Sequence, residues 1–320
     1  MDWTVYWFML PVCVIVASVA MFSGISGAAL LTPIFLIGFP LADVPTLTAV
    51  QAIGSALFLE TFGFGSGVVG YARRRLPDYR LLAQLAVVTV PLGIVGAALA
   101  RDAPATTLKA IYGSVMFVVA AVLIAEAAKA RVPPVAGGSD EPVAAPPPGS
   151  GATAGSRRAW RAHQWEEDGI RYIRARDGTI FTYRPRGERV TRLLTGTGAL
   201  LAGLISTGVG EATMPSLVRR VKMPVAVAAA TSTLVVASTV VGAAATHLVQ
   251  LAAEGGLSAI PWNLVVWAVP GAVVGAQIGA RLQGVFDERR TNYFFGVLFV
   301  AIGAAFLLSF TVFSSTFQTG

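Results

Sequence analysis

Two interrupted apolar stretches decide the fold: Gly24-Ile25-Ser26-Gly27, followed by Thr32-Pro33, and Ser206-Thr207-Gly208-Val209-Gly210-Glu211, followed by Met214-Pro215. Each lies where a membrane helix would otherwise continue. Glycine costs about 1 kcal/mol relative to alanine inside a helix, and it leaves the backbone free to unwind. Unwound backbone is tolerated in a bilayer only where protein or a water-filled cavity surrounds it. We therefore predict two broken helices that face the interior of the protein.

The composition is typical of a polytopic membrane protein. Of the 320 residues, 55% are hydrophobic and 13% are charged, whereas soluble domains are about 25% charged. The net charge of +7 comes from basic residues between the apolar runs, where cytoplasmic loops carry them, so it does not indicate nucleic acid. The single cysteine, Cys13, lies in an apolar run, so we expect a buried thiol and no intrachain disulfide.

The two parts of the chain match each other at several points in the same order. Val90-Pro91 with Gly96 corresponds to Val269-Pro270 with Gly275, Tyr112-Gly113 to Phe295-Gly296, and Pro33 to Pro215. We therefore predict a duplication, with a first membrane repeat at 1–126 and a second at 193–320. The matched glycines are expected to allow close helix packing. Paired breaks at corresponding points of two halves indicate the binding site of a transporter.

The basic residues predict how the repeats insert. If the segment after each break returns across the membrane, each repeat crosses five times, and the basic clusters at 73–75, 127–192, 219–222 and 281–290 share one side. Four crossings per repeat would divide these clusters, so the positive-inside rule favours five and makes the shared side cytoplasmic. Five is odd, so the repeats would be inverted. The predicted fold is an all-α plasma-membrane protein with about 8–10 membrane segments and both termini outside.

Residues 127–192 differ from the membrane segments. As far as Ser156 they are rich in Pro, Gly, Ala and Ser, which is typical of a flexible linker. Further on, Asp177-Gly178 separates the strings 170–174 and 179–183, a pattern that predicts a small β-hairpin outside the membrane. We expect this cytoplasmic insert to present its arginines to solvent. The alternative is a surface for a partner or for acidic lipid headgroups.

Together these features resemble the TauE/SafE family, also called the sulfite exporter family. The likeness rests on Gly24-x-x-Gly27 with Pro33, on Gly208-x-Gly210-Glu211 with Pro215, and on the Val-Pro…Gly motif of each half. It covers about 5–126 and 193–312 and leaves out the insert. The resemblance implies a secondary transporter of small anions, especially sulfite, sulfonates and related organosulfur compounds, coupled to an ion gradient.

The breaks predict an anion site without a fixed positive side chain. A helix that restarts after a break presents unpaired backbone N–H groups and the positive end of its dipole. Two such ends meeting near the midplane would attract an anion, with nearby hydroxyls as further donors. The predicted substrate-binding residues are Gly24, Ser26, Gly27, Thr32, Thr48, Gln51, Ser55, Ser206, Thr207, Gly208, Gly210, Thr213, Thr231 and Ser232. For any single serine or threonine, a bond within its own helix is the alternative.

Two carboxylates, Glu60 and Glu211, lie within apolar runs. A charge near mid-bilayer costs about 2.5–3.5 kcal/mol on insertion scales, so such residues indicate function by default. We predict that both couple proton movement to transport, Glu211 foremost because it lies in the break. The alternative for Glu211, weighted equally, is an N-terminal cap on the restarting helix.

Rival functions are a channel for a small solute, a membrane-embedded enzyme, and a sensor or scaffold acting through 127–192. The sequence has no HExxH pair, no metal-ligand cluster and no GxxxxGK[ST] loop, and we interpret His247 as a packing or loop residue. We therefore expect no enzyme activity, cofactor or nucleic-acid partner. The expected partners are a small anionic substrate and the lipid bilayer, and the sequence leaves a homo-oligomer open.

Overall fold

The computed structural model describes residues 2–23, 25–129, 163–282 and 288–316, and it is predominantly helical. The first half contains α1 (Met9–Ser23), α2 (Ala28–Pro33), the π-helical turn η1 (Ile34–Gly38), α3 (Phe39–Leu41), α4 (Ala49–Arg74), α5 (Tyr79–Asp102) and α6 (Ala105–Lys129). The second contains α8 (Glu188–Ile205), α9 (Val209–Arg219), α10 (Val225–Gly255), η2 (Leu257–Ala259), α11 (Trp262–Leu282) and α12 (Glu288–Thr316). Six of the described helices, α4, α5, α6, α10, α11 and α12, are long and apolar enough to cross a membrane. The predicted helical membrane fold is confirmed.

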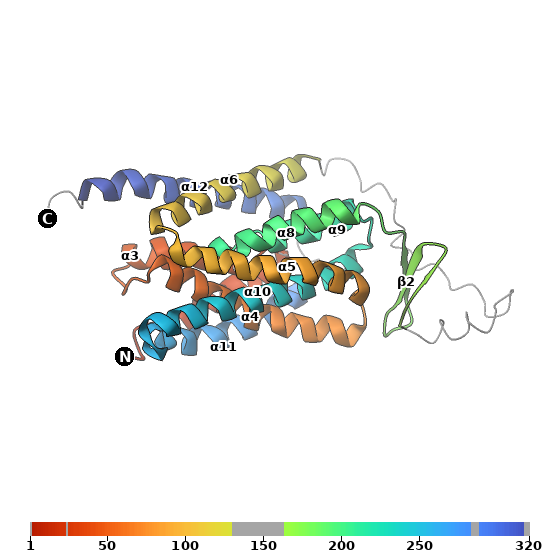
Figure 1. Ribbon diagram of the computed structural model, residues 1–320, viewed down its shortest axis with the longest axis horizontal. Helices are drawn as coiled ribbons and strands as arrows, with labels where there is room; N and C mark the ends of the chain where they lie inside the picture. The colour runs from red at the N-terminus through yellow and green to blue at the C-terminus, as the bar shows by residue number, and fades with distance from the viewer. Residues whose placement is uncertain (1, 24, 130–162, 283–287, 317–320) are drawn as a thin grey trace.

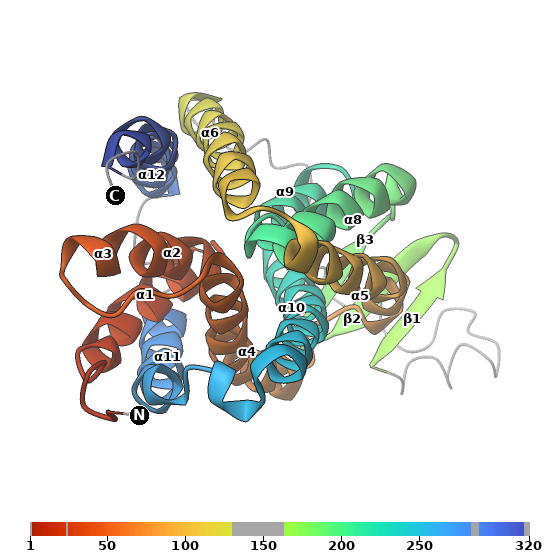
Figure 2. The same ribbon diagram turned by 60° about the vertical axis from the view of Figure 1, so that its left-hand side comes forward.

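The helices of the two halves pack reciprocally. α1 lies against α11. In the second half α8, which corresponds to α1 in the sequence match, lies against α5, which corresponds to α11. α4 pairs with its counterpart α10, and α6 pairs with α12 (Figure 2). This pattern is the one expected of two intertwined copies of a unit. It supports the inverted repeat, which stays a prediction.

The two ends of the bundle differ. The small sheet lies at one end, and the N-terminal residues and the end of α12 lie at the other (Figure 1). α3 lies at the end with the termini, whereas α9 leads toward the sheet. The two segments that follow the breaks therefore run to opposite ends of the molecule.

Glycines bring the helix backbones together. A Cβ added at Gly275 of α11 would lie 2.3 Å from the carbonyl oxygen of Val14 in α1. A Cβ at Gly96 of α5 would lie 2.1 Å from the carbonyl oxygen of Leu200 in α8. The close packing predicted for this matched pair of glycines is confirmed, and in each half it positions the helix that leads into a break.

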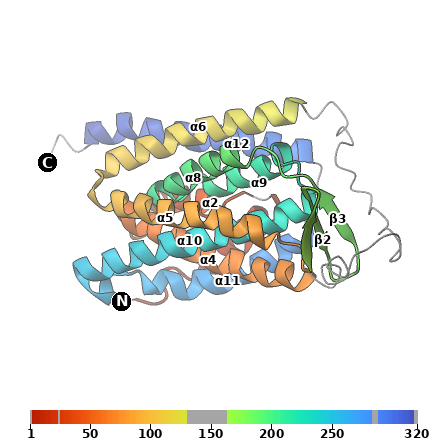
Figure 3. The same ribbon diagram turned by 45° about the vertical axis from the view of Figure 1, so that its right-hand side comes forward.

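The insert contains a three-stranded antiparallel sheet in the order β1 (Gln164–Glu167), β2 (Ile170–Arg174), β3 (Ile180–Tyr183). β2 and β3 form the predicted hairpin, with Ile173 opposite Phe181. β1 was not predicted from the sequence. One face of the sheet packs on the ends of α5, α9 and α10, where Ile173 and Tyr183 share an apolar cluster with Leu81, Leu217 and neighbouring residues (Figure 3).

The expectation that the insert's arginines face solvent is wrong for Arg171. Its side chain is buried and forms ion pairs with Asp78 at 3.3 Å and with Glu188 at 3.1 Å. Asp78 also caps the first turn of α5 and accepts a hydrogen bond from the Tyr183 hydroxyl. Burial, and then the Asp78 carboxylate, hold the pKa of Tyr183 well above its usual range. This cluster joins the sheet to the starts of α5 and α8.

We expect Gly275→Ala to destabilise the fold, because the added methyl group would collide with the Val14 carbonyl and push α1 away from α11. Overpacking of this kind costs about 1–3 kcal/mol. The measurement is thermal unfolding of the purified protein in detergent, with Gly70→Ala as the control because a Cβ there meets nothing within 4 Å. Equal melting temperatures for the two variants would contradict this packing.

Candidate anion site at the two helix breaks

The two breaks meet inside the protein. The Ser26 N–H donates to Oε1 of Glu211 at 3.1 Å, although the two residues are 185 positions apart. The Thr32 and Ser206 hydroxyls form a hydrogen bond at 2.6 Å. Ser26, Thr32 and Ser206 are all buried. The first break and the second therefore form one polar centre enclosed by apolar helices.

Backbone geometry explains why the second break occurs where it does. α8 ends at Ile205, Ser206 adopts a left-handed φ of 61°, and Gly208 has a φ of 123°, which L side chains rarely adopt. A Cβ at Gly198 would lie 2.5 Å from the Gly208 carbonyl oxygen, so the chain folds back tightly against α8. These residues turn the chain before α9 begins at Val209.

The Glu211 carboxylate joins the two breaks. Oε1 accepts from the Ser26 N–H, and Oε2 accepts from the Gly208 N–H at 3.0 Å. The second bond is an N-terminal capping bond of α9, so the capping alternative for Glu211 is confirmed. Its proton-coupling role stays a prediction. The carboxylate itself occupies backbone N–H groups from both breaks, as a bound anion would.

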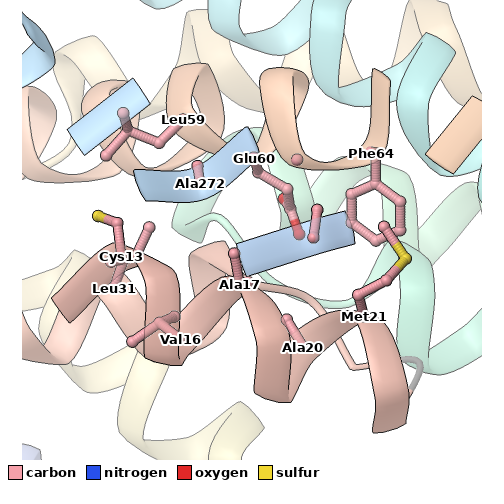
Figure 4. A pocket seen from close by; sticks show the side chains of 13 residues that line it. Cys13, Val16, Ala17, Ala20, Met21, Leu31, Leu59, Glu60, Phe64 and Ala272 are labelled. Atoms are coloured by element: carbon pink, nitrogen blue, oxygen red, sulfur yellow. The ribbon is translucent and has the colours of Figure 1, made fainter. Parts of the chain in front are cut away.

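Glu60 approaches the same centre from α4. It is 5% exposed and accepts a hydrogen bond from the Ser26 hydroxyl at 2.6 Å. Its side chain extends toward α1 beside a cavity of about 30 Å³, whose other walls are apolar and include Cys13 and Phe64 (Figure 4). This volume is enough for about one or two water molecules. Cys13 is a buried free thiol, as predicted. Ser26 thus binds both carboxylates, that of Glu211 through its N–H and that of Glu60 through its hydroxyl.

Tyr112, whose hydroxyl the sequence analysis did not single out, supports the first half-helix. Pro33 has no N–H, so the Ala29 carbonyl loses its partner within α2. The Tyr112 hydroxyl donates to that carbonyl oxygen at 2.6 Å. Pro33 signals that a donor is missing, but nothing in the sequence identifies the donor. The matched residue in the second half, Phe295, has no hydroxyl.

The structure places part of the predicted substrate-binding set at this centre. Those residues are Ser26, Gly27, Thr32, Ser206, Thr207, Gly208 and Gly210. Thr207 is buried, and its hydroxyl has no hydrogen-bond partner in the described part of the chain. It is therefore a free donor next to the second break.

The other predicted residues lie elsewhere or have other partners. Thr48 and Gln51 form a capping box at the start of α4, and Gln51 lies nine residues before Glu60, about 14 Å along the helix. Thr231 accepts a hydrogen bond from the Asp78 N–H, and the Thr213 hydroxyl donates to Val209 of its own helix. Ser55 and Ser232 are buried on α4 and α10, and Gly24 lies outside the described residues.

The hydrogen-bond donors of the centre are backbone N–H groups and hydroxyls rather than basic side chains. No lysine or arginine is hydrogen-bonded to Ser26, Ser206, Gly208 or Glu211 in the described ranges. Instead α2 and α9 both begin here, and a helix start carries about half a positive charge. Across the same ranges, no group of three or more His, Cys, Asp or Glu is placed to hold a metal ion.

We expect Tyr112→Phe to lower the melting temperature of the purified protein. The change leaves the buried Ala29 carbonyl without a partner, which costs about 1–3 kcal/mol. Tyr293→Phe is the matched control, because Tyr293 is exposed on α12. If both variants have the same melting temperature as the unmodified protein, the proposed support of the first half-helix by Tyr112 is wrong.

Comparison with known proteins gives one family and no individual relative. Residues 9–306 match the sulfite exporter TauE/SafE family. No curated protein and no solved structure matches the chain. The family match spans both membrane halves and the insert between them. The chain therefore belongs to the sulfite exporter TauE/SafE family, and it is a multi-pass membrane transporter of the class that moves sulfite-type anions rather than an enzyme.

Proposed function

We propose that this protein is a proton-coupled secondary transporter that moves sulfite, a sulfonate or a related organosulfur anion across the cell membrane. In this proposal the anion binds where the two breaks meet, and Glu211 couples its movement to a proton. The observation that carries the proposal is the Glu211 carboxylate held between the N–H groups of Ser26 and Gly208.

The N–H groups that hold this carboxylate are suited to a sulfite or sulfonate group. Both kinds of anion present several negatively charged oxygens in a small space, and both are favoured at a helix start. α2 and α9 contribute two such starts. The free hydroxyl of Thr207 offers one further donor. A site of this kind can bind a small anion without a lysine or arginine.

Protonation of Glu211 provides the coupling. While the carboxylate is charged, it occupies both N–H groups and repels a second anion. A proton removes that charge and weakens both hydrogen bonds, because bonds to ionised acceptors are about twice as strong as neutral ones. The substrate can then take the two N–H groups. Proton and anion binding therefore favour each other, and such coupling is reciprocal.

Glu60 extends the coupling to the first repeat. Its carboxylate and that of Glu211 both bind Ser26, and like charges so close together repel each other. A proton on either carboxyl group relieves this repulsion. Because α2 leads to one end of the bundle and α9 to the other, movement of either segment would open the shared centre to one side.

We expect Glu211→Gln to abolish sulfite uptake driven by a pH gradient in proteoliposomes while preserving sulfite binding. The neutral amide resembles protonated glutamate, so affinity should change by less than about tenfold, or 1.4 kcal/mol, and should depend less on pH than in the unmodified protein. Glu254→Gln is the control, since Glu254 is a partly exposed residue paired with Arg101. Unchanged pH-driven uptake in the Glu211 variant would refute its coupling role.

The proposed orientation places the insert in the cytoplasm and the end with the termini outside. Ala42 and Ser258 are exposed and lie in the loops after α3 and α10, whereas Arg184 is exposed beside the sheet. With Cys13 replaced by serine, a membrane-impermeant maleimide should label Ala42→Cys and Ser258→Cys in intact cells. It should label Arg184→Cys only after permeabilisation, and the reverse pattern would contradict this orientation.

A further inference from the structure

His247 is a buried histidine of α10 that the proposed coupling by Glu211 and Glu60 does not use. It is 0% exposed, and Nε2 lies 2.8 Å from the carbonyl oxygen of Gly203 in α8. A carbonyl oxygen only accepts hydrogen bonds, so Nε2 carries the hydrogen. In the neutral ring Nδ1 is then an acceptor, and it is buried without a hydrogen-bond partner in the described ranges.

The Gly203 carbonyl belongs to the broken end of α8. An intact helix would pair it with the N–H of Thr207, but α8 ends at Ile205 and Thr207 lies in the break. The last carbonyls of a helix need partners from outside it. His247 supplies one of them and so connects α10 to the end of α8, three residues before Ser206.

Close helix packing surrounds the His247 side chain. A Cβ at Gly54 of α4 would lie 2.9 Å from the Cβ of His247. A Cβ at Gly203 would lie 2.0 Å from the carbonyl oxygen of Gly93 in α5. The side chain is thus enclosed by α4 and by the end of α8, which itself packs on α5.

No ionisable side chain is hydrogen-bonded to the imidazole in the described ranges. Glu60 on α4 binds Ser26, Glu211 on α9 binds the breaks, and Glu254 on α10 pairs with Arg101 of α5. The other described ionisable residues of the helices packed around α10 lie toward helix ends; they are Tyr71, Arg73, Arg74, Tyr79, Arg80, Asp102, Glu188, Arg189, Arg192 and Arg219.

Protonation would therefore disturb this arrangement. The cation would place a second N–H at Nδ1, which has no hydrogen-bond partner in the described ranges, and a charge at a fully buried position. A buried unpaired donor and a buried unpaired charge are both unfavourable. The protonated ring would favour a conformation in which Nδ1 meets water or a carboxylate, and a fully buried ring can reach such a conformation only if the packing around it loosens.

We infer that His247 is a second proton-binding residue of the transporter, a positioning residue that holds the end of α8 when neutral and releases it when protonated. This inference rests on the proposed proton-coupled function and adds a residue to it. Histidine is the side chain that ordinarily changes charge between about pH 5 and 8, so the same proton gradient that neutralises Glu211 would act on it. Proton binding to the released conformation would shift the population toward it.

The first test measures the protonation state of the His247 imidazole directly. The chain has two histidines, so His163→Gln leaves His247 alone, and a protein purified without a histidine tag gives one ¹⁵N-histidine spectrum. We expect the neutral Nε2–H form at high pH and conversion to the cation between about pH 5 and 8. A ring that stays neutral throughout this range overturns the inference, whatever the transport assays show.

The second test measures sulfite uptake against pH. The amide of His247→Gln can still donate to the Gly203 carbonyl but does not titrate, whereas His247→Phe loses both properties. We expect the glutamine variant to keep its melting temperature but to show a smaller increase in uptake as the pH falls than the unmodified protein, because Glu211 and Glu60 still take protons. The phenylalanine variant should show the same smaller increase and also melt at a lower temperature. A glutamine variant with an unchanged pH profile overturns the inference while leaving the proposed function intact. If the unmodified protein itself shows no pH-dependent uptake, the proposed function fails, and the imidazole titration alone decides the inference.

Discussion

The rest of the structure depends on the Glu211 carboxylate between the N–H groups of Ser26 and Gly208. Inside a membrane no bulk water is available to pair backbone groups that a broken helix leaves free, and each unpaired group costs several kcal/mol. One carboxylate pairs a donor from each break and so joins residues from opposite halves of the chain. The same two hydrogen bonds join the two halves and mark the place where we propose that an anion binds.

Side chains from other helices form hydrogen bonds with further backbone groups that the broken helices leave unpaired. Tyr112 pairs the Ala29 carbonyl that Pro33 leaves free, and His247 pairs the Gly203 carbonyl at the end of α8. Of these partners, glutamate and histidine change their hydrogen bonding when they take a proton, whereas tyrosine keeps the same bond over the physiological range. A transporter built in this way can therefore change its interior through protonation without moving a charged side chain through lipid.

The membrane class, the two breaks and the β2–β3 hairpin could be predicted from sequence, because composition, glycine and proline positions and the Asp177-Gly178 turn are local signals. The hydrogen-bond and ion-pair partners of individual side chains could not be predicted. The position of Glu211 in the sequence indicates a cap on its own helix. Only the three-dimensional packing brings the Ser26 N–H to the second carboxylate oxygen of Glu211. Thr48 and Thr231 were predicted at the site because they are polar residues in the segments that follow the breaks. Instead, the Thr48 hydroxyl caps the start of α4, and the Thr231 hydroxyl accepts a hydrogen bond from the Asp78 N–H before α5. Arg171 looks like a surface residue until the sheet packs on Asp78.

The most direct measurement of the central claim is an experimental density map of the protein at low pH with saturating sulfite. We predict density for the anion within hydrogen-bonding distance of the Ser26 and Gly208 N–H groups, with the Glu211 side chain displaced from them. A map in which Glu211 keeps both bonds while sulfite binds elsewhere would contradict the account.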